Sequence, residues 1–226
     1  MKVKYLYLLF IIFFDTSNVS HASVVVDGTR MIFKGDKREQ SLHVHNPDKS
    51  PQLVQAWIEG EFGKENVKTF IITPPLFRLN TDISNVLRIT RITDSLPKNK
   101  ESLFWINIKS IQQSQKNNDK NQLEIAIKTR IKLIYRPQSL RGTSTDVADK
   151  ILWKCHASEL SVYNPTPFYI NFHSVKMNGV DVNDVTYISP YKSLNIHTSH
   201  KCKGSIISWE LLNDFGNIDR AYNMTV

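Results

Sequence analysis

Two cysteines and their neighbouring histidines are the residues of this chain most suited to hold a metal ion. Cys155-His156 and His200-Lys201-Cys202 together offer two sulfur and two nitrogen donors, which is a ligand set of tetrahedral zinc sites. Adjacent residues on a strand, however, point to opposite faces, and zinc sites normally take paired ligands separated by two or more residues. A disulfide, two free thiols and a metal site are therefore the alternatives, and the metal site is the least favoured.

Other chemistry-bearing residues form no catalytic pattern. His43 and His45 share a strand face, but no third ligand is evident near them. The GEFGKE segment (residues 60–65) contains a Gly-Lys pair without the glycine spacing that cradles phosphates. The sequence also lacks G-x-S-x-G, H-E-x-x-H and G-x-G-x-x-G. We therefore expect no enzymatic activity, no cofactor and no metal site.

The N-terminal segment has the pattern of a secretory signal. Lys2 and Lys4 precede the apolar run YLYLLFIIFF (residues 5–14), and Ser20-His21-Ala22 supplies small residues at the cleavage position. The run is too short to span a bilayer as a helix. We predict a signal peptide over residues 1–22 and a protein that is not embedded in a membrane. Export to an oxidising compartment favours a disulfide between Cys155 and Cys202.

The charge balance gives little information about partners. The 226-residue chain has a formal net charge of +8, and its basic residues are dispersed among predicted strands and loops. A solvated basic surface explains such a distribution, whereas nucleic-acid binding normally needs a clustered basic patch. We therefore expect no nucleic-acid partner.

Strand signals run through the whole exported part of the chain, and no segment shows a sustained helical period. Segments rich in β-branched and aromatic residues alternate with Gly, Pro, Asn and Asp punctuation. The polar stretch RGTSTDVADK (residues 141–150) is a predicted connector between two domains. The sequence thus predicts an all-β protein with domains at residues 23–142 and 143–226. The predicted strands include SVVVDGTRMIF, LVQAWIEG, VLRITRI, LFWINIKSI, PFYINFHSV and SIISWELLN.

The stretch LEIAIKTRIKLIYRP (residues 123–137) predicts an unusually long strand that ends before Pro137. Its apolar residues share one parity and its charged residues the other, so the strand has one apolar face. At about 3.3 Å per residue it would extend for roughly 40 Å. Taken alone, the apolar residues are typical of the core of a central strand. They are Leu123, Ile125, Ile127, Ile131, Leu133 and Tyr135.

Several motifs, in their order and spacing, resemble the PapD-like periplasmic pilus chaperones of the chaperone–usher pathway. The resemblance covers nearly the whole exported chain, and the segments at residues 96–111 and 131–137 are the most specific. The short loop before the long strand, without flanking cysteines, resembles the short-loop branch of the family. The motifs are DGTR, QAWIE, TPPLFRLN, LPKNKESLFWINIKSI, IKLIYRP, NPTPFYI and NDFG.

The resemblance implies two immunoglobulin-like β-sandwich domains in a boomerang arrangement, located in the periplasm. It implies a chaperone that captures, folds and caps pilus or fimbrial subunits by donor-strand complementation and delivers them to the outer-membrane usher. Because an exposed apolar row favours self-association, a homodimer in which two copies cap each other is a further possible state. The alternative is a β-sandwich fimbrial structural subunit or adhesin, although such a subunit would be a single domain.

The resemblance also assigns roles to residues. Arg30 and Lys132 match the basic anchors of the subunit's C-terminal carboxylate, and the donor-strand row is Leu123, Ile125 and Ile127. The residues that match the inter-domain salt bridge are Glu101, Arg136 and Asp214. Lys132 has the opposite parity to Ile127, so we expect strand twist or a bulge to bring it round to the cleft.

Overall fold

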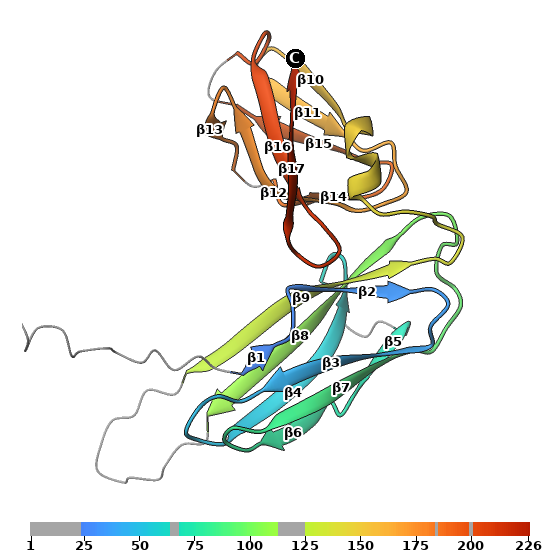
Figure 1. Cartoon of the computed structure of the whole chain (residues 1–226), viewed down its shortest axis with the longest axis vertical. Helices are drawn as coiled ribbons and strands as arrows, with labels where there is room; N and C mark the ends of the chain where they lie inside the picture. The colour runs from blue at the N-terminus through green and yellow to red at the C-terminus, as the bar shows by residue number, and fades with distance from the viewer. Residues whose placement is uncertain (1–23, 64–67, 113–124, 184, 199–200) are drawn as a thin grey trace, which may run out of the picture.

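The computed structural model of the chain describes residues 24–63, 68–112, 125–183, 185–198 and 201–226. The predicted signal peptide lies outside these residues. Apart from a 3-10 helix at Thr145–Lys150, the regular elements of the described residues are all strands. They form two β-sandwich lobes that meet end to end at an angle (Figure 1), which confirms the all-β, two-domain expectation.

The first domain packs two sheets face to face. One sheet has the order β1-β3-β7-β5, formed by β1 (Val25–Val26), β3 (Glu39–His45), β7 (Ser84–Arg91) and β5 (Phe70–Thr73). The other has the order β2-β9-β8-β4-β6, formed by β2 (Arg30–Lys34), β9 (Ala126–Arg136), β8 (Ser102–Gln112), β4 (Gln52–Gly60) and β6 (Leu76–Leu79). Strand β9 ends before Pro137, as predicted.

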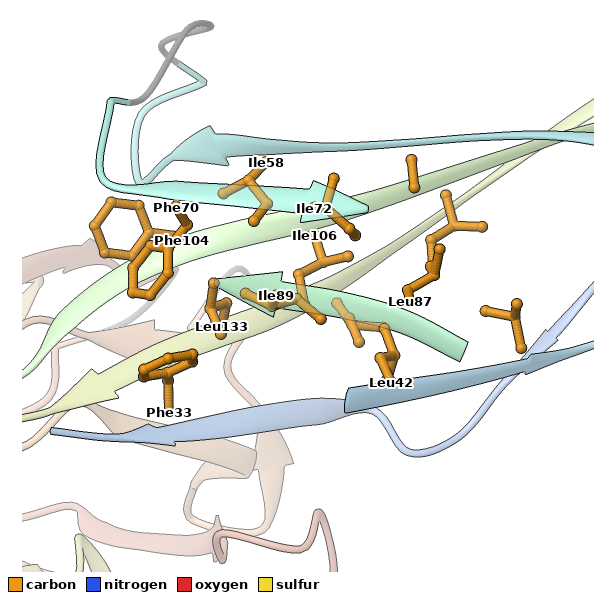
Figure 2. Close-up of a cluster of buried hydrophobic side chains, with 14 of the residues drawn as sticks. Phe33, Leu42, Ile58, Phe70, Ile72, Leu87, Ile89, Phe104, Ile106 and Leu133 are labelled. Atoms are coloured by element: carbon orange, nitrogen blue, oxygen red, sulfur yellow. The ribbon is translucent and has the colours of Figure 1, made fainter. Parts of the chain in front are cut away.

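Alternating apolar residues of the two sheets meet in the first core (Figure 2). Phe70 contacts Phe33 and Phe104 edge-on, with ring centroids 4.9 and 5.1 Å apart. Ile106 and Leu133 of the second sheet are fully buried beside them. Burying each such side chain contributes roughly 1.5–3 kcal/mol, so this core is the main stabilising feature of the first domain.

The second domain is a smaller sandwich. Its sheets are β10-β11-β15, formed by β10 (Leu152–His156), β11 (Glu159–Tyr163) and β15 (Ser193–His197), and β13-β12-β16-β17. The latter consists of β13 (Val180–Asp181), β12 (Ile170–Met177), β16 (Ile206–Leu212) and β17 (Ile218–Thr225), with β14 (Tyr187–Ile188) paired to β12. Trp153 and Trp209 pack against each other in its core, with their ring centroids 5.6 Å apart.

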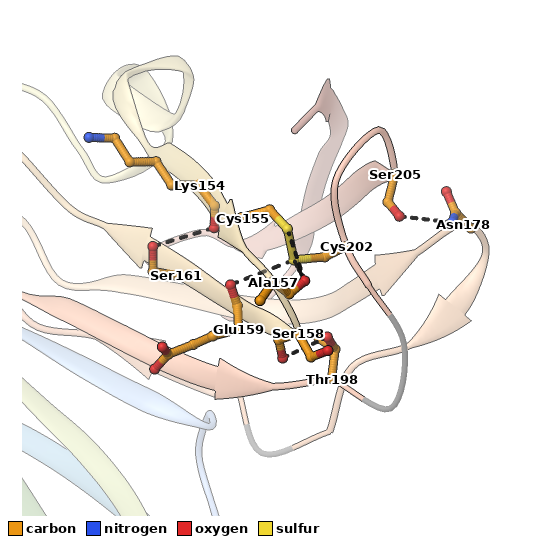
Figure 3. Close-up of a disulfide and its surroundings, with 10 residues drawn as sticks. All are labelled: Lys154, Cys155, Ala157, Ser158, Glu159, Ser161, Asn178, Thr198, Cys202 and Ser205. Carbon is orange, nitrogen blue, oxygen red and sulfur yellow. Dashed lines mark hydrogen bonds between the residues drawn. A yellow bond between two sulfur atoms is a disulfide. The ribbon is translucent and has the colours of Figure 1, made fainter.

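A disulfide joins Cys155 on β10 to Cys202 (Figure 3), which confirms the favoured alternative and excludes the metal site proposed for these sulfurs. The cysteines are 47 residues apart in sequence. On the chain-entropy account, a loop of that size stabilises the folded domain by about 4 kcal/mol. The bridge therefore compensates for the small core of this domain.

The predicted connector is partly integrated into the second domain. Residues Thr145–Lys150 form the 3-10 helix, and Ala148 is fully buried in the second core. The lobes contact each other through a small apolar cluster between the end of the β8/β9 pair and the start of β12. Its buried members are Leu103, Ile134 and Tyr169. Because of this contact, the face of the β8/β9 sheet that carries Leu103 and Ile134 packs against the second domain.

Candidate functional site

Strand β9 has an open edge along part of its length. It pairs with β8 from Ala126 to Tyr135, whereas the short strand β2 pairs only with Lys132–Arg136 on the other side. Residues 126–131 of β9 therefore have no strand on that side within the described chain. Unpaired N–H and C=O groups on an edge are a template for another strand.

The apolar row of β9 changes from buried to exposed at the same point. Ile131, Leu133 and Tyr135 are buried in the first core. Ile127 is 45% exposed and Ile125, just before the strand, is 62% exposed. Leu123 lies outside the described residues. The described half of the row thus presents two isoleucines beside an open backbone edge.

Lys132 faces the second domain without any irregularity in the strand. The β8–β9 register is continuous, so of the two expected means of turning Lys132, twist or a bulge, the bulge is absent. Normal alternation suffices, because the second domain packs on the face opposite the apolar row. There the Lys132 Nζ donates a hydrogen bond to Asn171 Oδ1 at 2.6 Å and lies 4.6 Å from the ring centroid of Tyr187. The same covering domain buries Ile134, which shares Lys132's parity.

Arg30 is the register partner of Lys132 on the adjacent strand, so their side chains share a face. The buried Arg30 Nε has no hydrogen-bond partner in the part of the chain that the structure describes. Burial lowers the pKa of Arg30, an effect that the nearby Asp214 opposes. Burial and the charge of Arg30 lower the pKa of Lys132 to about 8. Arg30 and Lys132 are thus two partly buried positive charges that repel each other. A bound anion would offset this repulsion.

The three residues assigned to an inter-domain salt bridge lie in contact. Arg136 Nε donates to Glu101 Oε1 at 2.7 Å, and its two terminal nitrogens donate to Asp214 at 2.6 and 2.8 Å. The other Glu101 oxygen accepts from the Tyr169 amide at 2.7 Å. Burial raises the pKa of Glu101 to about 7 although Arg136 opposes the shift. The network links the first domain to two separate loops of the second.

Glu61 makes a second inter-domain crossing that sequence reasoning missed. Its carboxylate accepts hydrogen bonds from the Tyr169 hydroxyl at 2.9 Å and the Ser189 hydroxyl at 2.7 Å. Its backbone oxygen accepts from Trp105 Nε1 at 3.1 Å. Burial, followed by the charge of Glu61, raises the pKa of Tyr169 above its usual value. The only sequence signal was its place in GEFGKE, which points to no such role.

The charged residues of the open segment are held on the face opposite the isoleucines. Lys128 lies over Trp57, 4.9 Å from its centroid, and Arg130 lies over Trp105 at 4.4 Å. Both cations also pair with Glu59, at 3.6 and 3.1 Å. These contacts leave the apolar side and the backbone edge as the parts of this segment that are without cover.

Among the described residues, no group of three or more His, Cys, Asp or Glu side chains is arranged to bind a metal ion. No helix within the same residues is long and apolar enough to cross a membrane.

Comparison with known proteins decides the family. Residues 23–141 match the family described as pili and flagellar-assembly chaperone, PapD N-terminal domain, and residues 146–223 match the pili assembly chaperone PapD, C-terminal domain. The chain belongs to the PapD-like family of pilus chaperones. Both halves of this chaperone therefore match domains of the same family, and the boundary between the matches falls within the connector.

Relatives over nearly the full length support the same conclusion. The chaperone is 37% identical to the probable fimbrial chaperone LpfB of Escherichia coli O157:H7, covering 96% of this chain and 94% of the relative. It is 40% identical to the chaperone protein LpfB of Salmonella typhimurium strain LT2, covering 85% and 84%. A chain in the complex of the Salmonella enterica SafA pilin with the SafB chaperone superimposes with a TM-score of 0.84 at 30% identity, covering 90% of this chain and 96% of that chain.

Proposed function

We propose that this chaperone captures pilus or fimbrial subunits by lending them the open segment of β9. The observation that carries the proposal is the division of one strand. Its second half is buried and paired on both sides, whereas residues 126–131 are paired on one side only. Next to that open edge, Ile125 and Ile127 are exposed.

Donor-strand complementation explains this division physically. The backbone edge would provide hydrogen bonds to the subunit, and side chains two residues apart would enter successive pockets of an apolar groove. Leu123 would extend the same row. The buried half of β9 holds the donor segment on a rigid sheet, which lowers the ordering cost of binding.

Arg30 and Lys132 would anchor the C-terminal carboxylate of the subunit. Arg30 is suited to a forked contact, and Lys132 supplies a compact charge. A one-residue slip in register would turn every donor side chain to the wrong face, so a fixed anchor at the strand's buried end would set the register. The Glu101–Arg136–Asp214 network would fix the angle between the two domains.

The remaining proposals concern location and partners. Residues 1–22 would direct the chain to the periplasm, with domains at residues 23–142 and 143–226. There the chaperone would deliver its subunit to an outer-membrane usher. Relatives include proteins named fimbrial chaperones, and one superimposed structure contains a chaperone bound to a pilin. In the absence of a subunit, two copies of the chaperone would cap each other's apolar rows.

The test is subunit capture by charge-removal variants. Arg30→Ala and Lys132→Ala should each lose a co-expressed pilin that the unchanged chaperone retains at about one-to-one ratio, with melting temperatures unaffected. Arg88→Ala is the matched control, because Arg88 is an exposed arginine on the other sheet, paired with Glu39 at 3.3 Å. Normal retention of the pilin by a folded Arg30→Ala or Lys132→Ala variant contradicts the anchor assignment.

A further inference from the structure

The turn between β16 and β17 presents a large apolar side chain to solvent. Phe215 is 84% exposed, yet the backbone around it is firmly held. The Asn213 side-chain oxygen accepts from the amides of Phe215 and Asn217 at 3.0 and 3.1 Å, and Asp214 is bonded twice to Arg136. An aromatic ring on an already ordered turn loses little entropy when a partner covers it.

This turn lies close to Arg30, one of the two cations. Gly216 has φ of +86°, and a Cβ at that position would be 3.8 Å from Arg30 Nε and in collision with the Thr29 hydroxyl. Only a glycine lets the turn approach β2 so closely. In Figure 1 the β16–β17 hairpin accordingly reaches down to the start of β2. Phe215 thus directly precedes the glycine that approaches Arg30.

We infer that Phe215 is a specificity-determining residue that contacts an apolar side chain close to the C-terminal carboxylate of the captured subunit. The inference rests on the proposed function. Arg30, whose Nε is buried without a partner in the described chain, and Lys132 would select an anion, and the exposed ring on the residue before Gly216 would select an apolar neighbour of that anion. At about 3.3 Å per extended residue, the contacted side chain lies within roughly the last three residues.

The test uses the full chaperone and short synthetic peptides with an N-terminal fluorescent label. One peptide carries phenylalanine next to its free C-terminal carboxylate, a second carries serine there, and a third is the phenylalanine peptide with a C-terminal amide. Binding is followed by fluorescence anisotropy for the unchanged chaperone, Phe215→Ala and Phe62→Ala. Phe62 is a matched control because it is 83% exposed but follows β4, three strands away from β2 in the sheet.

The expected result is that the phenylalanine peptide binds about tenfold or more tightly than the serine peptide, a difference typical of burying one aromatic side chain. Phe215→Ala should abolish that difference and keep the melting temperature, while Phe62→Ala should preserve both. An unchanged difference in Phe215→Ala, or an equal loss in Phe62→Ala, overturns the inference. Equal binding of the amide and the carboxylate overturns the anchor in the proposed function instead, and failure of all peptides to bind contradicts both.

Discussion

At the scale of single residues, Lys132 is the group whose charge its burial and the neighbouring Arg30 make sensitive to pH. Its pKa is lowered to about 8 by burial and by Arg30. A lysine with a lowered pKa is charged below that value and neutral above it. Capture through a carboxylate should therefore be complete below about pH 8 and weaken as the pH rises through it.

This first prediction is checked by measuring subunit affinity across that range for the unchanged chaperone and Lys132→Arg. Arginine keeps its charge to about pH 12 or higher, so the variant should bind with much less pH dependence. Arg30 serves as an internal constant, since it stays charged throughout. Equal affinity on both sides of pH 8 in the unchanged protein would show that Lys132 does not contact the carboxylate.

Residue spacing in the sequence predicted which side chains share a face of β9, but not what covers each face. The alternation of apolar and charged residues placed Lys132 opposite Ile127, as the structure has it. No bulge is needed to bring Lys132 to the second domain, because that domain covers the Lys132 face. This packing has no signal in the spacing of one strand. Glu61 was missed for the same reason: its partners Tyr169 and Ser189 are more than a hundred positions away.

At the scale of elements, the two parts of β9 have different proposed roles. The buried end holds the strand in the first domain, and the open segment binds the subunit. Ile127 and Ile131 have the same parity and the same side chain, but Ile131 is buried and Ile127 is 45% exposed. Replacing each with alanine should separate the two roles. Ile131→Ala should lower the free energy of unfolding by about 2 to 5 kcal/mol, because it leaves a cavity in the first core.

Ile127→Ala should change the free energy of unfolding far less and should instead weaken subunit capture by about tenfold or more, since it empties one pocket of the groove. Denaturant unfolding and a capture assay on both variants provide the measurement. The donor-strand assignment fails if Ile127→Ala destabilises the free chaperone as much as Ile131→Ala and leaves capture of the subunit unchanged.

Each sandwich contains a buried asparagine that precedes a proline. The sequence shows both Asn-Pro pairs, but their structural role was not predicted from it. Asn46 and Asn164 each precede a proline and are fully buried. The Asn46 amide donates to the carbonyls of Leu79 and Asn80, and the Asn164 amide donates to those of Phe168 and Ser189. An Asn-Pro pair predicts a turn, but only the fold shows that its side chain also binds backbone carbonyls 34 residues away from Asn46 and 25 residues away from Asn164.

At the scale of the whole molecule, the two domains were predictable because strand patterns and turn punctuation are local. Their relative orientation was not, because it depends on a few contacts between distant residues. Even the known motifs implied only one crossing, through Glu101, Arg136 and Asp214. The structure adds the crossing of Glu61 to Tyr169 and Ser189, and Tyr169 is held by both: Glu101 binds its amide and Glu61 its hydroxyl.

Two crossings on different strands should restrain the inter-domain angle jointly. The Arg136 crossing starts from β9, and the Glu61 crossing starts after β4, two strands away in the sheet. Glu61→Ala or Asp214→Ala alone should leave one crossing intact, at a stability cost of about 1–3 kcal/mol each for the polar groups left unpaired. The double variant keeps the hydrogen bonds of Glu101 to the Tyr169 amide and of Lys132 to Asn171, but it loses the side-chain contacts of both crossings. Its effect on the angle should therefore exceed the sum of the single effects.

This prediction is measured as a distance distribution between spin labels at Arg88→Cys and Val180→Cys, one exposed site in each domain. The distribution should stay narrow in each single variant and broaden in the double variant. Asp181→Ala is the control, because the exposed Asp181 pairs only weakly with Lys176 inside the second domain, at 4.0 Å. A narrow distribution in the double variant would mean that the remaining contacts are enough to hold the domains, namely the apolar cluster of Leu103, Ile134 and Tyr169 and the hydrogen bonds of Glu101 and Lys132. A broad one would mean that polar contacts set the angle of the cleft, and subunit capture should then fall in the same variant, although Arg30, Lys132 and the β9 row are unaltered.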